Sequence, residues 1–105
     1  MDKYLLKVES NCKDPSREDE YHHWYDDIHI PDVLETPGFV RGACYKILQP
    51  KPGQGRYIAI YEMETDNYDN LMAAHQANMK RKEAQGRMTD LFSPVSRAIY
   101  KMVES

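Results

Sequence analysis

The sequence predicts a single α+β domain, spanning residues 1–105, whose strands and helices follow one another in the order βαββαβ. The length of 105 residues fits one domain. Four stretches alternate apolar and polar side chains at strand spacing, and two intervening stretches repeat apolar side chains at helix spacing. No internal repeat and no low-complexity segment interrupts this order.

The first half of the chain reads as a strand followed by a helix. The strand is expected at residues 4–9, and the turn after it offers Asp14 or Ser16 as the N-cap of the helix. Pro31 disfavours helical geometry at the residue before it, so the helix should end or kink there. Bulky side chains recur at helical spacing within it, at Tyr21, Trp24, Tyr25 and Ile28.

The second half reads as two strands, a helix and a last strand. The strands at 39–48 and 56–64 are separated by a hairpin loop rich in proline and glycine. Thr65 or Asp66 can cap the second helix, and the last strand is expected at 94–103. The second helix should run to about residue 83 and carries one stripe of mostly apolar residues, Tyr68, Leu71, Met72, His75 and Met79.

Both helices must cover the same face of a four-stranded antiparallel sheet, because each β–α–β crossover is right-handed. This is the ferredoxin-like arrangement. The second and third strands nevertheless carry apolar or aromatic side chains on both faces, whereas a sheet wetted on one side alternates more cleanly. We therefore expect a homodimer in which a second copy packs against the bare face around a two-fold axis. The bare face should hold Arg41, Tyr45, Tyr57 and Tyr61, a set too polar for a dry core, so the dimer should leave room for a ligand between its sheets.

Composition narrows the classes of partner. With 14 basic and 17 acidic side chains the net charge is -3, which gives no reason to expect nucleic acid. No apolar run approaches the roughly 18 residues of a membrane span, and the first residues lack the apolar core of a signal peptide. We therefore expect a cytoplasmic protein with no membrane partner, in which Cys12 and Cys44 are free thiols. The eight tyrosines suit a pocket for an aromatic ligand and equally suit packing within strands.

Residues 21–31, YHHWYDDIHIP, hold the densest group of chemically useful side chains. His29 follows His22 by seven residues and Tyr25 by four, so all three border one side of a helix. Asp26 can hydrogen-bond the imidazole of His29 and fix its tautomer, which would let His29 act as a general acid or base. Two alternatives stay open: a histidine that caps its own helix, and a metal site formed by His22, Asp26 and His29.

The string WYDDIHIPDVLETPGF at residues 24–39, together with the element order, resembles the dimeric α+β barrel superfamily and, within it, the EthD-like branch. In that branch a helix with a W/Y-Y-x-x-x-H-x-P pattern runs into a PGF turn. Members of the superfamily include polyketide cyclases, lactone isomerases, decarboxylases, lyases, haem-degrading enzymes and cofactor-free monooxygenases, so the fold does not fix the reaction. The matching residues are Trp24, Tyr25, His29, Pro31, Pro37, Gly38 and Phe39.

The resemblance implies a cofactor-independent enzyme that acts on a small aromatic or polyketide-like carbonyl compound. Related cyclases turn a histidine of the second helix into the cavity, which favours His75 beside His29, and Tyr45 and Tyr61 are the candidate phenol donors. Arg41 could neutralise an anionic substrate or form a surface salt bridge. The other residues expected to bind substrate are His22, Trp24, Tyr25 and Tyr57.

The expected reaction is a cyclisation, isomerisation, decarboxylation or lyase reaction driven by His29 with Asp26, Tyr45, Tyr61 and His75. Two alternatives are an oxygen-using monooxygenase that works in the same pocket without metal or flavin, and a non-catalytic dimer that holds a hydrophobic metabolite or a partner enzyme.

Overall fold

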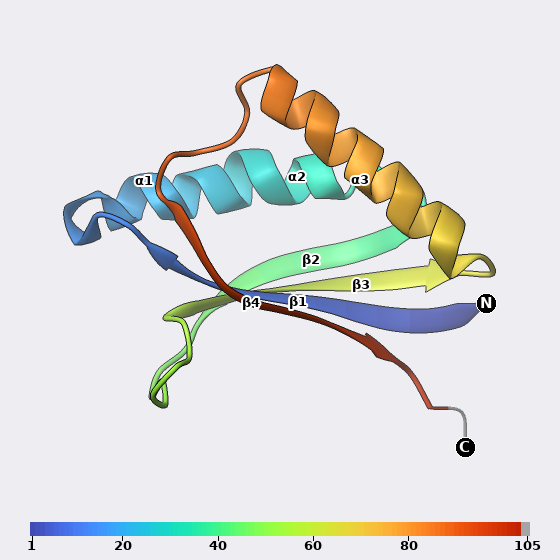
Figure 1. Ribbon diagram of the computed structural model, residues 1–105, viewed down its shortest axis with the longest axis horizontal. Coiled ribbons are helices and arrows are strands. Elements are labelled where there is room, and N and C mark those ends of the chain that lie inside the picture. The colour runs from blue at the N-terminus through green and yellow to red at the C-terminus, as the bar shows by residue number, and fades with distance from the viewer. Residues whose placement is uncertain (104–105) are drawn as a thin grey trace.

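A computed structural model describes residues 1–103 and has the expected α+β arrangement. Four antiparallel strands form one sheet in the order β2-β3-β1-β4, and the helices lie on one face of it (Figure 1). The ferredoxin-like topology predicted from the sequence is therefore confirmed. The strands are β1 (Asp2–Cys12), β2 (Phe39–Lys46), β3 (Tyr57–Thr65) and β4 (Phe92–Lys101).

The first helical segment is continuous but changes its winding along its length. It comprises η1 (Pro15–Arg17), α1 (Glu18–His23), η2 (Trp24–His29) and α2 (Ile30–Val33). Asp14 caps its start, as expected, by accepting a hydrogen bond of 3.0 Å from the Ser16 backbone. The segment η2 is a π-helix, in which the Ile30 N–H donates to the carbonyl of Tyr25, five residues earlier.

Of the two outcomes expected at Pro31, an end or a kink, the helix does not end there: its winding changes just before the proline, and helical structure continues to Val33. In an α-helix the proline ring clashes with the carbonyl four residues before it. The π-turn that precedes Pro31 is wider, and it relieves that clash. The proline then occupies the first turn of α2, where a missing N–H is tolerated.

The second helix is α3 (Tyr68–Ala84), and its cap differs from the predicted one. Asn67 accepts a hydrogen bond of 3.0 Å from the Asn70 N–H, whereas Thr65 accepts one from Asn67 itself. The predicted stripe is confirmed in outline: Leu71, Met72 and His75 are buried. The helix starts beside the end of β3 and rises away from the sheet toward its own C-terminal end (Figure 1).

The strand register fixes which side chains lie under the helices. Tyr61 of β3 stands between Gly42 of β2 and Leu6 of β1, and Leu6 in turn pairs with Ile99 of β4. Tyr61 and Leu6 are each 2% exposed, so this row lies on the helix-covered face. Gly42 is required here, because an added Cβ would come within 2.7 Å of the Tyr61 ring.

The prediction that Arg41, Tyr45, Tyr57 and Tyr61 share the bare face is wrong. Tyr57 and Tyr61 are buried beneath the helices, whereas Arg41 and Tyr45 pair with Glu62 and Ile58 on the opposite face. Two physical features explain the difference. The alternation of β3 leaves two orientations open, and the bulkier tyrosine set takes the helix side. A register shift between Phe39 and Arg41 then reverses the phase of β2, so that Phe39 points inward and Arg41 outward.

The core is formed by the helix-covered side of the sheet and the inner sides of the helices. Aromatic side chains dominate it, and they supply large apolar area with hydroxyl groups that need partners. In the part of the chain that the structure describes, residues 1–103, no helix has both the length and the apolar character needed to cross a membrane. The largest fully buried side chains are Tyr21, Tyr25, Tyr57, Tyr61, Leu6, Met63, Leu91 and Val33.

Candidate functional site

The π-turn places His29 against Trp24. The two rings are stacked, with centroids 4.4 Å apart and planes 15° from parallel, and Tyr25 meets the imidazole edge-on at 5.5 Å. Residues five apart in an α-helix are separated by about 140° around the axis. The wider π-turn brings Trp24 and His29 onto the same side, which no α-helical pattern predicts.

His29 is a neutral imidazole at physiological pH. Burial among the aromatic rings lowers its pKa from 6.5 to about 4, with a further lowering by His75 and a partial opposing effect of Asp32. The ring is therefore unprotonated, and its bare nitrogen can accept a hydrogen bond. This supports a polar role for His29 within an otherwise apolar surrounding.

Asp26 does not support His29 as the sequence suggested. The Asp26 side chain is exposed, and within residues 1–103 it makes no hydrogen bond to the imidazole, because the π-turn alters the three-residue spacing. The carboxylate instead lies near Cys44, whose pKa is raised to about 11 by burial and by this charge. Among the described residues no group of three or more His, Cys, Asp or Glu side chains is placed to hold a metal ion. His22, Asp26 and His29 therefore form no such group.

Two buried polar atoms on the helix-covered face have no partner within residues 1–103: Tyr61 Oη and His75 Nδ1. The Phe39 ring lies beside both side chains, 4.9 Å from the His75 ring and 6.2 Å from the Tyr61 ring. Burial raises the pKa of Tyr61 and lowers that of His75, so both groups are neutral. A buried polar atom left unpaired costs about 1–3 kcal/mol, so these two atoms call for a ligand or a functional explanation.

A second phenol cluster lies further along the same face. The Tyr21 and Ser10 hydroxyls share a buried hydrogen bond of 2.6 Å, and Tyr21 meets Tyr25 edge-on at 5.3 Å. Burial raises the pKa of Tyr21 to about 12 and also raises that of Tyr25. Sequence reasoning missed Tyr21 and Ser10 as polar members of the core, although Tyr21 stands on the recognised helical stripe. His22 is exposed, and its ring stands nearly perpendicular to the Tyr57 ring, with the two ring centroids 5.2 Å apart.

Arg41 lies apart from this buried cluster, on the bare face of the sheet, whereas Tyr45 borders a small cleft of about 60 Å³ together with His22, Tyr25, Asp26 and Tyr57. Arg41 forms an ion pair of 2.9 Å with Glu62, which agrees with the surface salt bridge considered for it. Tyr45 is 55% exposed. The residues expected to form one site are thus divided between two faces of the sheet.

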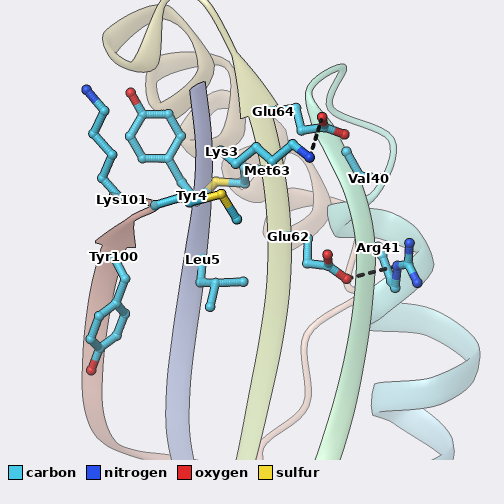
Figure 2. A pocket seen from close by; sticks show the side chains of 11 residues that line it. Lys3, Tyr4, Leu5, Val40, Arg41, Glu62, Met63, Glu64, Tyr100 and Lys101 are labelled. Atoms are coloured by element: carbon cyan, nitrogen blue, oxygen red, sulfur yellow. Dashed lines mark ion pairs between the residues drawn. The ribbon is translucent and has the colours of Figure 1, made fainter. Parts of the chain in front are cut away.

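A groove of about 370 Å³ opens on the bare face (Figure 2). Leu5 and Tyr100 supply apolar surface, and the Arg41–Glu62 and Lys3–Glu64 pairs form its polar side (Figure 2). A second hollow, of about 390 Å³, lies between Trp24 and the loop that carries Met88. His29 lines neither of these two hollows.

The loop between α3 and β4 holds the Trp24–His29 stack in place. The Trp24 indole N–H donates to the carbonyl of Arg87 at 2.8 Å. The Arg87 guanidinium donates two hydrogen bonds, of 2.7 and 3.0 Å, to the carboxylate of Asp32. Asp32 is 4% exposed, and its backbone carbonyl also accepts from Asn78 at 2.8 Å. Nothing in the sequence pattern pairs Asp32 with Arg87, because their contact depends on the path of the loop.

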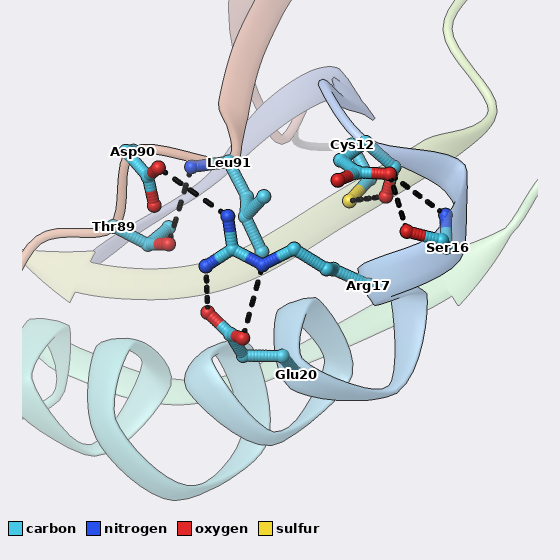
Figure 3. A network of polar contacts seen from close by, with 8 residues as sticks. Cys12, Ser16, Arg17, Glu20, Thr89, Asp90 and Leu91 are labelled. Carbon is cyan, nitrogen blue, oxygen red and sulfur yellow. Dashed lines mark hydrogen bonds and ion pairs between the residues drawn. The ribbon is translucent and has the colours of Figure 1, made fainter.

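The same loop is tied to the start of the first helical segment. The Arg17 guanidinium donates hydrogen bonds to two carboxylates, from Nε to Glu20 at 3.1 Å and from Nη1 to Asp90 at 3.4 Å (Figure 3). The Leu91 N–H donates to Thr89 within the loop, at 3.2 Å (Figure 3). These side chains are exposed, so the pairs contribute little to stability but fix where the loop runs.

Solved structures confirm the fold. A protein of Shewanella loihica PV-4, whose assignment as a monooxygenase is provisional, is 16% identical with a TM-score of 0.62, over 100% of this chain and 99% of that one. A dimeric ferredoxin-like protein of unknown function from Thermobifida fusca YX is 10% identical with a TM-score of 0.59, over 98% and 92%. An EthD family protein of Bacillus halodurans C-125 is 19% identical with a TM-score of 0.53, over 98% and 100%.

These identities show the fold alone, and membership of the EthD-like branch stays a prediction. A search of curated proteins finds no match. The sequence profile of one family, "Domain of unknown function (DUF4286)", matches residues 3–100. Because that match covers nearly the whole chain, the protein belongs to the DUF4286 family.

Proposed function

We propose that the protein is an enzyme that moves protons on a small aromatic or polyketide-like carbonyl compound, and that it uses molecular oxygen without a resident cofactor. The observation that carries the proposal is the pair of unpartnered buried atoms, Tyr61 Oη and His75 Nδ1, in a protein whose His29 is also neutral. Monooxygenase names among proteins of the same fold favour the oxygen-using reaction over the cyclase, isomerase, decarboxylase and lyase alternatives.

His29 is the proposed general base. Its neutral ring takes a proton from an acidic carbon or hydroxyl of the substrate, and the anion that forms raises the pKa of the imidazole, since negative charge stabilises imidazolium. Tyr61 Oη and His75 Nδ1 are the proposed partners for the oxygen on which that charge develops. Tyr45 and Asp26 have no part in this proposal, because both are exposed.

The overall reaction balances with oxygen as the only co-reactant: RR′CH2 + O2 gives RR′C=O + H2O. The carbanion left by proton removal donates an electron pair to oxygen and forms a C–O bond. The peroxide then loses its O–O bond together with the second C–H proton, which yields the ketone and water. His29 returns the first proton to the departing oxygen, so the base is restored at the end of each turnover.

The proposed active form is a homodimer joined through the bare faces of the sheets. The bare face carries Tyr45 and Tyr100, which are 55% and 49% exposed, beside the half-buried Leu5 and Ile60. Exposed aromatic side chains over an apolar centre are typical of an interface. The dimeric protein of Thermobifida fusca has the same fold and supports this proposal.

The test is oxygen uptake with 1,8-dihydroxyanthrone as the probe. The wild type should consume oxygen faster than the uncatalysed background, and His29→Phe, which keeps an aromatic ring against Trp24, should lose about 10²–10⁴-fold. The matched control is His23→Phe, because His23 is exposed and, within residues 1–103, pairs only with Asp27, at 3.2 Å. Full activity in a folded His29→Phe protein would contradict the proposal.

A non-catalytic dimer that holds a ligand is the second candidate, favoured by the groove of about 370 Å³ on the bare face. In this case 1,8-dihydroxyanthrone would bind without being converted. Binding would then respond to Leu5→Ala in the groove and not to His29→Phe. Product analysis by mass spectrometry separates the two candidates.

A further inference from the structure

The loop between β2 and β3, residues 47–56, projects from the sheet on the side away from the helices, where Figure 1 draws it in green. We call this segment the arm. It carries Leu48, which is 85% exposed and so buries almost none of its apolar surface within its own chain. Tyr100 and Met102, which are 49% and 60% exposed, line the groove on the same side of the sheet. The arm and the bare face thus present apolar side chains toward the same space.

Hydrogen bonds hold the arm in one shape before any partner binds. The Lys51 N–H donates to Gln54 Oε1 at 2.9 Å, and the Gln54 N–H donates back to the Lys51 carbonyl at 3.0 Å. At the base of the arm the Gly55 N–H donates to Glu9 Oε1 at 3.0 Å. A Cβ on Gly55 would come within 2.8 Å of the Ser10 carbonyl oxygen, so the arm lies directly against β1. A segment that is already ordered loses little conformational entropy when it binds.

The bare-face groove of about 370 Å³ lies at the opposite end of the strands from the arm. Its lining includes Val40, near the start of β2, and Glu64, near the end of β3, whereas the arm joins the end of β2 to the start of β3. At about 3.3 Å per residue, the extended chain from Val40 to Leu48 spans about 25 Å. The arm of a chain therefore lies far from the groove of the same chain, and only a second copy can bring the two together.

We propose that the arm of one copy seats Leu48 in the bare-face groove of a second copy, beside Val40, with the strands of the facing sheets running in opposite directions. A two-fold axis that crosses both β2 strands near their middle brings the arm end of each strand over the groove end of the other. Each copy then gives one arm and receives one, as a self-complementary interface requires. This inference rests on the homodimer of the proposed function and deepens it, since it names the contact that the second copy supplies.

The charges at the two ends of the bare face are complementary in this arrangement. The arm carries Lys51 and Arg56 and no acidic residue, and Lys51 forms no ion pair within residues 1–103. The groove end holds Glu64, whose only pair in this part of the chain is a 4.0 Å contact with the exposed Lys3. Along β1, Lys3 stands at the groove end and Glu9 at the arm end. Reversing one sheet over the other therefore brings opposite charges together at both ends.

A groove that holds Leu48 of a second copy has no space for a ligand. The substrate would then bind on the helix-covered face, where Tyr61 Oη and His75 Nδ1 lack partners within residues 1–103. The proposed contact thus opposes the non-catalytic candidate that holds its ligand in the groove.

Disulfide formation between introduced cysteines tests the contact. Leu48→Cys and Val40→Cys are combined in a full chain that also carries Cys12→Ala and Cys44→Ala, and the protein is oxidised mildly. A disulfide needs Cα atoms within about 7 Å, so each bond formed must join two copies. The double variant should run as a covalent dimer on a non-reducing gel. Leu48→Cys alone should not, and neither should Leu48→Cys with Met88→Cys, the matched control, because Met88 is exposed on the helix side.

Sedimentation velocity on chains that keep both native cysteines gives a second measurement. Leu48→Ala removes apolar contact from both arms of the dimer and should weaken association by at least about tenfold. Leu48→Met keeps the apolar volume and should lose clearly less. Met88→Ala is the matched control and should associate as the wild type does, because Met88 lies away from the bare face.

Two results would overturn the arm contact: a wild-type dimer whose double-cysteine variant forms no covalent bond, or Leu48→Ala associating as tightly as the wild type. Either result leaves the homodimer and the proposed reaction standing, because a dimer can form through the sheets alone. A wild type that stays a single chain overturns the arm contact and the homodimer together. Full oxygen uptake by His29→Phe refutes the reaction and does not bear on the arm.

Discussion

The carboxylate of Asp32 accepts two hydrogen bonds from Arg87, of 2.7 and 3.0 Å, although the two residues are 55 positions apart in the chain. Burial alone would raise the pKa of Asp32, but the hydrogen bonds and charge of Arg87, with the charge of Lys82, hold it below its ordinary value. The pair fastens the loop after α3 to α2. The carbonyl of the same Arg87 holds the Trp24 indole, so the pair also positions the ring on which His29 stacks.

A double-mutant cycle should detect this coupling. Asp32→Asn and Arg87→Gln should each lower the free energy of unfolding by about 1–2 kcal/mol, less than for a fully buried pair because Arg87 is 41% exposed. The double variant should lose less than the sum of the single losses. Urea unfolding followed by the fluorescence of Trp24, the only tryptophan, provides the measurement. Strictly additive losses would show that the two residues act independently.

Two tyrosine-to-phenylalanine variants should respond in opposite directions. Tyr61→Phe removes a buried hydroxyl that has no partner within residues 1–103, so stability should stay level or rise by about 1 kcal/mol. Tyr21→Phe breaks the 2.6 Å bond to Ser10 and leaves that hydroxyl buried and unpaired, so stability should fall by about 1–2 kcal/mol. Thermal unfolding compares them. A clear loss in Tyr61→Phe would mean that its hydroxyl already has a structural partner, and would weaken its proposed role.

The partly buried His29 should make stability depend on pH. Its pKa falls from 6.5 in the unfolded chain to about 4 in the fold, so between these values the unfolded chain binds more protons. The stability that depends on a neutral His29 is therefore fully present above pH 6.5. It is lost as the pH falls toward 4, and the loss amounts to at most about 3 kcal/mol of unfolding free energy. The measurement is the difference in unfolding free energy between wild type and His29→Phe across this range, in which the other titrating groups cancel. A constant difference would contradict the lowered pKa.

The dimer should depend on the bare face of the sheet. Tyr100→Glu and Tyr45→Glu place charge where two apolar surfaces would meet, and each should weaken association by at least about tenfold. Met88→Glu is the matched control, because Met88 is an exposed apolar residue of the loop on the helix side. Sedimentation velocity gives the association state. A wild-type protein that remains a single chain at about 100 μM would refute the dimer, since a specific interface holds at such concentrations.

The topology was predictable because a periodic pattern of apolar residues marks each helix and strand along most of its length. The stripe of Leu71, Met72 and His75 on α3 and the alternation of Tyr57, Ala59 and Tyr61 on β3 repeat at spacings set by backbone geometry. Handedness rules then leave one way to place two helices on the sheet. A pattern that extends along a whole element still identifies that element when either of its ends is misplaced by one or two residues.

The orientation of β2 was not predictable in the same way. A single register shift between Phe39 and Arg41 reverses the side to which every later residue of the strand points. Tyr45 was therefore expected beside Tyr61 and lies on the other face of the sheet. The Asp32–Arg87 contact could not be predicted for a different reason. It depends on the path by which the loop after α3 returns to the first helical segment, and the sequence of a loop carries no periodic pattern.

The π-turn at Trp24–His29 amounts to one residue more than an α-helix of the same rise would need. Deleting Asp27, an exposed residue inside it, would let regular α-helical bonding resume on both sides. Trp24 and the histidine would then be four positions apart in an α-helix, about 40° around the axis, so their rings would stay on one side of it. The wide turn thus lets the helix carry one additional residue while the imidazole keeps the side of the helix that a chain one residue shorter would also give it.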